Sequence, residues 1–221
     1  MSEKIKVEIF LDDLASSSPD ANIIHEGLEK IAHQINSNPF EVIGDTRKLR
    51  ISHDPSRPIN ILKTNWPRLE ADYAIVLTDR NIVGSTPNET LGSAVRYRDR
   101  NHINGLAVIK ATAIQPEIIT AHEVGHLMGV EYPLNSEFDM HCASPDCLMH
   151  DKVRYEHISE RIPKKGFRGL LERLGYVPAE YIDSERHAAQ SFCTPCQEQL
   201  AKKAFFSLKY LNGESVSPTW L

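Results

Sequence analysis

Hydrophobic and polar residues alternate near the start of the chain and then recur with a different period. From Lys4 to Leu11 every second residue is aliphatic, which is the pattern of a half-buried β-strand. The apolar residues that follow recur at helical spacing: Ile23, Ile24, Leu28, Ile31 and Ile35. This spacing predicts an amphipathic helix, which ends before Asn38 and Pro39 because proline cannot continue a helix.

Four more segments have the character of β-strands. The pattern predicts a second strand over Phe40–Ile51 and a fully buried strand in the apolar run Ala71–Thr78. Two further strands are predicted over Ser93–Tyr97 and Leu106–Lys110, and the hydrophilic residues 98–102 between them predict a turn.

A long helix is predicted over residues 116–130. Pro116 and Glu117 suit its first turn, and Ile118, Ile119, Val124, Leu127 and Met128 form an apolar stripe along it. After Met149 the pattern predicts helices over Gly166–Gly175 and Cys196–Leu211. This order of elements is typical of an α+β fold, with a twisted mixed β-sheet backed by helices and a helical C-terminal part.

The composition narrows the class of protein. With 221 residues, the chain fits a single domain. Its net charge of -5, without a long basic run, argues against a nucleic-acid partner. The first ten residues lack the apolar core of a signal peptide, and no stretch approaches the roughly 18 apolar residues that span a membrane. We therefore expect a cytoplasmic protein without a membrane partner, and we expect it to be a monomer.

The most informative short pattern is His122-Glu123-Val124-Gly125-His126. Residues four apart lie on one face of a helix, so the two imidazoles can chelate one metal ion. The Glu123 carboxylate between them can reach a water bound to that metal. Zinc lowers the pKa of its water to about 7, so this carboxylate can take a proton at neutral pH. The pattern predicts a zinc site with Glu123 as its base.

The alternative interpretation is an amphipathic helix with two surface histidines. The apolar stripe of residues 118–128 argues against it, because it predicts that the helix is buried. Buried imidazoles and a buried carboxylate are costly unless a metal ion or other partners satisfy them.

All four cysteines lie in the second half of the chain: Cys142, Cys147, Cys193 and Cys196. A C-x4-C pair followed by a C-x2-C pair has the form of a tetrahedral four-thiolate zinc site. A redox C-x-x-C or two disulfides are the alternatives. The expected reducing compartment favours structural zinc.

A catalytic zinc needs a third protein ligand. In one large group of zinc peptidases, a glycine three residues after the second His allows a sharp turn, and a third His follows three residues later. Gly129 suits the turn, but position 132 is Tyr. Glu131, Tyr132 and His141 remain as candidates from the residues alone.

Taken together, the motif residues resemble the archaemetzincin signature. The matching residues are His122, Glu123, His126, Gly129, His141, Cys142, Cys147, Met149, Cys193 and Cys196. The chain departs from that signature in having nine extra residues between Gly129 and His141, and in a later C-x-x-C pair.

The resemblance implies a compact metzincin-like (zincin) fold with two zinc ions. It implies a catalytic zinc held by His122, His126 and His141, and a structural zinc held by Cys142, Cys147, Cys193 and Cys196. Met149 matches the methionine of the Met-turn beneath the catalytic metal, although spacing alone fits an ordinary core residue. The single domain would comprise a sheet-rich part (1–115), the active-site helix (116–130) and a lower part with the structural zinc (131–221).

Three classes of function follow from this pattern. The first is a zinc metallopeptidase, an aminopeptidase or narrow endopeptidase, with Glu123 as general base and acid. For this class, the resemblance implies that the peptide lies extended along an edge strand among residues 93–110. The second is a zinc hydrolase of a non-peptide amide. The third is a catalytically silent zinc-binding protein, against which the presence of Glu123 argues. Because His141 precedes Cys142, we also hypothesise that the structural zinc holds the third histidine in place.

Overall fold

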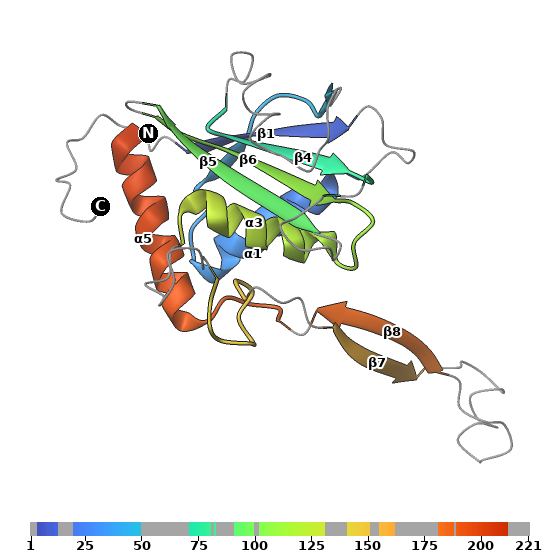
Figure 1. The fold of residues 1–221 in the computed structure, drawn as a ribbon. Helices are drawn as coiled ribbons and strands as arrows, with labels where there is room; N and C mark the ends of the chain where they lie inside the picture. Colours follow the sequence, from blue (N-terminus) through green and yellow to red (C-terminus); the bar gives the residue numbers. More distant parts are fainter. Residues whose placement is uncertain are drawn as a thin grey trace, which may run out of the picture.

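The structure is a computed structural model, and it describes residues 4–12, 20–49, 71–80, 82, 91–99, 102–130, 141–150, 155–161, 181–187 and 189–211. A six-stranded sheet forms its centre, with two helices against one face (Figure 1). The predicted α+β class with a mixed sheet is confirmed.

The sheet has the strand order β2-β1-β4-β6-β5, and β3 also pairs with β1. Its strands are β1 (Ile5–Asp12), β2 (Phe40–Val42), β3 (Arg47–Leu49), β4 (Tyr73–Thr78), β5 (Gly92–Asp99) and β6 (His102–Lys110). All pairs are parallel except β5 with β6, which form an antiparallel hairpin. In this strand order, the antiparallel strand β5 lies at one end of the sheet.

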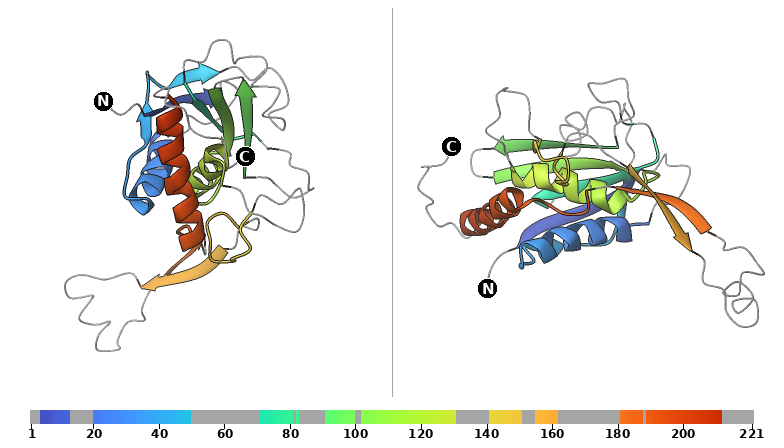
Figure 2. Two further views of the ribbon diagram at one scale, coloured as in Figure 1. Left: turned by 90° about the vertical axis from the view of Figure 1, so that its left-hand side faces the viewer. Right: turned by 90° about the horizontal axis from the view of Figure 1, so that it is seen from below.

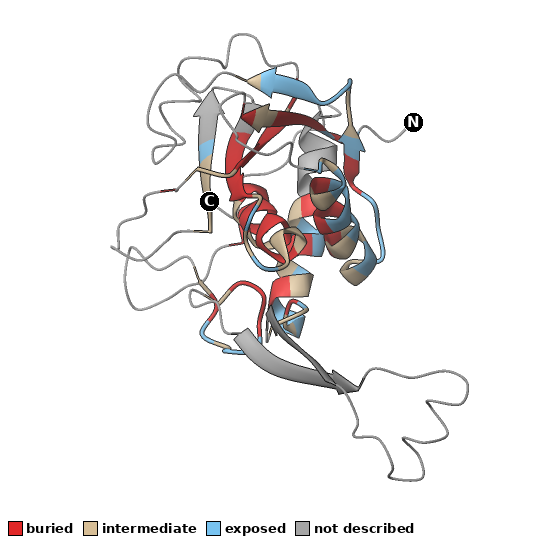
Figure 3. Cartoon of the chain, turned by 90° about the vertical axis from the view of Figure 1, so that its right-hand side faces the viewer, coloured by how far each residue is buried: buried red, intermediate tan, exposed pale blue. Residues whose placement is uncertain are grey.

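Helices α1 (Asn22–Gln34) and α3 (Pro116–Met128) pack on the same face of the sheet (Figure 2). Alternate residues of the strands face them, including Val7, Ile75 and Ile109, all of which are fully buried. The intervening residues, such as Val76 and Val108, form a second apolar cluster on the other face. Strand β4 is buried on both faces, which explains why its sequence is a continuous apolar run. Figure 3 shows this buried layer between the sheet and the helices.

The two helices touch closely at Gly27. A methyl group at this position would lie 2.6 Å from Thr120 of α3, so only glycine allows the contact. The third helix, α5 (Thr194–Leu211), adds Leu200 and Ala204 to the same core. Helix α3 is therefore held by the sheet, by α1 and by α5.

Three expectations from the sequence were wrong in part. The strand expected over Phe40–Ile51 is two short strands, because Gly44 adopts a φ of 69° and turns the chain between them. The hydrophilic turn expected at residues 98–102 is shorter, since β5 extends to Asp99 and β6 starts at His102.

The third error concerns the expected helical C-terminal part. The chain forms an antiparallel ribbon of β7 (Tyr155–Arg161) and β8 (Tyr181–His187), which stands away from the sheet (Figure 1). Both strands are rich in charged residues, so they lack the apolar alternation by which a buried strand is found. The helix expected over Gly166–Gly175 lies outside the described residues, whereas the one expected over Cys196–Leu211 is confirmed as α5.

Candidate metal centres

Helix α3 carries three of the predicted site residues on consecutive turns. Pro116 occupies the first turn of the helix, and Gly129 ends it with a φ of 80°. This left-handed conformation favours glycine and closes the helix three residues after His126. The chain therefore turns at Gly129, and it returns to the helix within residues 141–150.

The structure brings His122, His126 and His141 together. The Nε2 atoms of His122 and His126 are 3.0 Å apart, and the ring of His141 lies 5.4 and 5.0 Å from the other two rings. One ring nitrogen of each histidine lies within 4.8 Å of the others. Two imidazole nitrogens on a tetrahedral zinc are about 3.3 Å apart, so the three histidines fit such an ion.

Hydrogen bonding orients the first of these histidines. The Nδ1 atom of His122 lies 2.6 Å from the main-chain carbonyl oxygen of Leu148. Since a carbonyl only accepts, Nδ1 donates, and a neutral His122 presents its Nε2 lone pair to the other two rings.

His126 is held in the neutral form. Burial lowers its pKa well below the usual value, and His122, His141 and Arg96 lower it further by charge repulsion. Its Nδ1 atom is buried and, within the part of the chain that the structure describes, makes no hydrogen bond. A neutral imidazole is the form that binds metal, so the lowered pKa suits a ligand.

Glu123 directly follows His122 on α3 and is 7% exposed. Burial raises the pKa of its carboxyl group to about 8. A cation bound by the neighbouring histidines would favour the ionised carboxylate and oppose this effect of burial. The carboxyl group is therefore suited to exchanging a proton near neutral pH when a metal ion is bound.

Met149 is fully buried beneath α3. A methyl group at Gly125 would lie 2.6 Å from the Met149 sulfur, so the methionine packs against the helix between the two ligand positions. The resemblance placed a methionine beneath the metal, and the structure places this side chain under the same turn.

The four cysteines also converge. Their sulfur atoms lie within 4.8 Å of one another, and the pairs are 3.6 Å (Cys142 and Cys193), 3.2 Å (Cys147 and Cys196) and 3.0 Å (Cys193 and Cys196) apart. These separations are far longer than a disulfide bond and near the roughly 3.8 Å between sulfurs on a tetrahedral zinc. None of the four cysteines forms a disulfide bond. Their arrangement fits one structural zinc and none of the disulfides considered above.

The environment of Cys147 favours its thiolate, the form that binds zinc, whereas burial raises the pKa of the Cys193 thiol. The hydrogen bond with Cys196 lowers the pKa of the Cys147 thiol to about 5, against the effect of burial. The main-chain N–H groups of Ser144 and Cys193 also lie 3.4 and 3.3 Å from the sulfurs of Cys142 and Cys147. Such N–H donors stabilise negative charge on sulfur.

The segment that carries His141 is tied to the second half of the cysteine group. Within the segment, the N–H of Cys142 donates to the carbonyl of Met149 at 2.8 Å. The N–H of Leu148 donates to the carbonyl of Ser191 at 2.9 Å, and Ser191 lies two residues before Cys193 of the second cysteine pair. The three-histidine group and the four-cysteine group therefore share one short, cross-linked segment.

Two alternative third ligands, Glu131 and Tyr132, lie outside the described residues. Two contacts escaped the sequence analysis, namely the Leu148 carbonyl and the glycine at position 92, which lies over Glu123. A main-chain carbonyl leaves no signal in a sequence. Gly92 does leave a signal in the sequence, because it immediately precedes the predicted strand Ser93–Tyr97.

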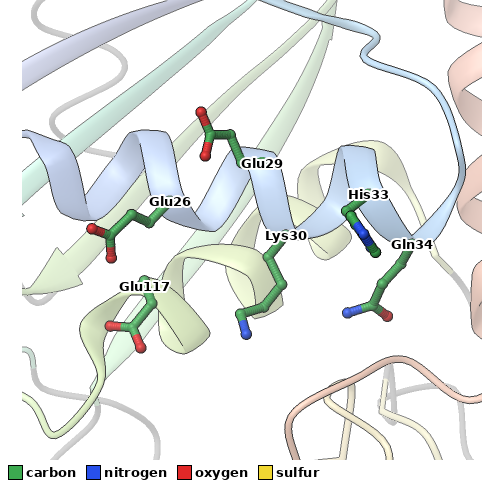
Figure 4. Close-up of a pocket in the computed structure, with 6 residues that line it drawn as sticks. All are labelled: Glu26, Glu29, Lys30, His33, Gln34 and Glu117. Carbon is green, nitrogen blue, oxygen red and sulfur yellow. The ribbon is translucent and has the colours of Figure 1, made fainter.

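A polar hollow of about 540 Å³ lies over α1 and the start of α3 (Figure 4). Its lining residues are Glu26, Glu29, Lys30, His33, Gln34 and Glu117. None of them is a predicted ligand, so this hollow is separate from both candidate metal centres. Among the described residues, no helix combines the length and the apolar character needed to cross a membrane.

Fold and site together define an α+β protein with two candidate metal centres, one of three histidines beside a carboxyl group and one of four cysteines. No protein-family model matches the chain, and no curated protein matches its sequence.

Among solved structures, the chain is similar to archaemetzincin AmzA from Archaeoglobus fulgidus, a structure complexed with malonate. The identity is 13% and the TM-score 0.43, over 88% of this chain and 99% of that chain. It is also similar to metalloproteinase-II from Bacteroides fragilis, at 16% identity and a TM-score of 0.41, over 67% of this chain and 46% of that chain. These are likenesses of fold at low identity, and the chemistry of the site depends on this chain's own residues.

Proposed function

We propose that this protein is a zinc-dependent peptidase that hydrolyses peptide bonds with Glu123 as general base and acid. The observation that carries the proposal is the convergence of His122, His126 and His141, with the buried Glu123 next to His122 on α3. Three imidazole ligands leave one position of a tetrahedral zinc open, as in catalytic sites, whereas four cysteines close the second site.

Zinc, when bound by the three histidines, supplies polarisation of the scissile carbonyl and makes a water molecule acidic. Glu123 then takes the proton of the attacking water, and it delivers that proton to the nitrogen of the leaving amine. The burial of Glu123 keeps bulk water from competing for the proton. His122 keeps its lone pair on Nε2 throughout, because Leu148 holds the proton on Nδ1.

The substrate would bind as an added strand along β5. This strand ends the order β2-β1-β4-β6-β5, so no described strand pairs with its outer edge. Main-chain groups at such an edge can hydrogen-bond an extended peptide. Because β5 also packs on α3, a peptide on this edge would pass near Glu123.

The test combines zinc analysis with digestion of a peptide library by the wild-type protein and by Glu123→Ala. We expect two zinc ions per chain in both proteins and cleavage by the wild type alone. Cleavage by Glu123→Ala at the wild-type rate would contradict the role of the carboxyl group. Absence of cleavage by a fully loaded wild type would contradict the peptidase and favour a non-peptide amide as substrate.

A further inference from the structure

The backbone of strand β5 lies directly over the side chain of Glu123. A methyl group at Gly92 would lie 2.6 Å from Oε1 and 2.7 Å from Cγ of Glu123, and 2.7 Å from Cγ2 of Ile119. Carbon atoms do not approach other heavy atoms this closely without a shift. Any larger residue at position 92 must therefore displace the carboxyl group or the strand.

We propose that Gly92 is a positioning residue, which lets the edge strand hold the Glu123 carboxyl group at a fixed place beside the three histidines. This inference rests on the proposed function, since it assigns the position of the base in that reaction. It adds that the strand expected to receive the peptide also determines where the base lies.

The contact is made by a part of the molecule that cannot easily move. Gly92 pairs with Ile109 of β6, and the N–H of Lys110 donates to the carbonyl of Leu91 at 2.9 Å. A side chain in this place could rotate away, whereas a paired backbone cannot. Glu123 is itself 7% exposed, so its carboxyl group has little other space to occupy.

A close glycine contact can also serve packing alone, and the neighbouring strand offers that case. A methyl group at Gly105 of β6 would lie 2.7 Å from Cδ2 of Leu127, which is the same close approach without a carboxyl group. Gly105→Ala is therefore a matched control for Gly92→Ala, because both add one methyl group beneath α3.

The first test is kinetic. A misplacement of a catalytic group by about 1 Å can cost 10²-fold in rate. We expect Gly92→Ala to keep two zinc ions, to hold KM within about twofold, and to lose about 100-fold in kcat. We expect Gly105→Ala to keep kcat within about threefold. A wild-type kcat in Gly92→Ala, or an equal loss in both variants, would overturn the proposal.

Rescue by a shorter base provides the second readout. Glu123→Asp withdraws the carboxyl group by one methylene and makes room for the methyl group at position 92. We therefore combine Gly92→Ala and Glu123→Asp in one double variant. We expect its fold-loss in kcat to be smaller than the product of the fold-losses in the two single variants. Multiplicative losses would count against a direct effect of residue 92 on the base.

The third test needs no activity. Adding one methyl group to a packed site costs stability, and we expect Gly92→Ala to lower the Tm by about 5 °C in the wild type. In a Glu123→Ala background the shift should be smaller, since only the Ile119 contact remains. Equal Tm shifts in the two backgrounds would overturn the proposal that residue 92 acts on Glu123. If the wild type cleaves no peptide, the proposed function fails, and this comparison alone decides whether Gly92 positions Glu123.

Discussion

The Nδ1 atom of His122 lies 2.6 Å from the carbonyl oxygen of Leu148, the residue between Cys147 and Met149. One peptide segment therefore links a member of the four-cysteine group to the orientation of the first histidine. The same segment begins with His141 and Cys142, so two of the three histidines depend on how it is held. The two candidate metal centres are adjacent in structure and share their supporting residues.

This relationship predicts that the two centres lose metal together. Cys142→Ser removes one thiolate from the structural site and loosens the segment beside His141. We expect zinc to leave the four-cysteine group, and the affinity of the three-histidine group for zinc to fall about 10- to 100-fold. Zinc content and competition with a chelator measure both effects. A Cys142→Ser protein with full metal content and normal stability would contradict the link, and Ser144→Ala serves as a control in the same segment.

The third ligand can be tested with two histidines from this segment. His141→Ala removes a nitrogen from the three-histidine group, whereas His150→Ala alters a histidine that is not part of it. We expect His141→Ala to retain about one zinc ion per chain, that of the four cysteines, and His150→Ala to retain two. Elemental analysis distinguishes these outcomes. Two tightly held ions in His141→Ala would mean that another residue completes the site.

The raised pKa of Glu123 predicts a pH dependence of stability in protein whose three-histidine zinc has been removed. Its pKa rises from 4.5 to about 8 on folding, so between these values the folded state binds more protons than the unfolded state. Stability therefore falls as the pH rises through this window. We expect Glu123→Gln and the wild type to have similar unfolding free energies at pH 4.5. At pH 8 we expect Glu123→Gln to be the more stable.

Urea unfolding at several pH values checks this expectation. The difference between the two proteins isolates Glu123, because all other groups are common to both. Restoring zinc should reduce the difference at pH 8, since the cation favours the charged carboxylate. A difference that does not change with pH would contradict the assigned environment of Glu123.

Tyr73 anchors the C-terminal end of helix α3. Its buried hydroxyl group donates a hydrogen bond of 3.1 Å to the carbonyl of Leu127, next to His126, and burial raises the pKa of Tyr73. Tyr73→Phe leaves that carbonyl without this donor. We expect a loss of about 1 kcal/mol in the free energy of unfolding, with little change in zinc content. An unchanged unfolding free energy would mean that the helix end gains nothing from this bond.

The sequence predicted those helices and strands in which the spacing of apolar residues reflects burial of one or both faces. Helices α1 and α3 and strands β1 and β4 followed from apolar spacing, because each packs against the same core. The ribbon of β7 and β8 was missed because it stands away from that core. The break between β2 and β3 was missed because the only mark of the positive φ at Gly44 in the sequence is the glycine itself.

The sequence by itself determined the chemistry available to this protein. His122, Glu123 and His126 lie within one local pattern, and the spacing of four residues requires only a helix to place both imidazoles on one face. The paired cysteines were likewise recognisable from short spacings. These inferences needed no knowledge of distant contacts.

Tertiary structure decided which distant residues meet these local groups. It placed His141 beside His122 and His126, joined the two cysteine pairs, and set Leu148 and Gly92 against the site. Such contacts join segments far apart in the chain, and two of them involve the backbone or the absence of a side chain. Their energies depend on how whole elements pack, so no local pattern of residues encodes them.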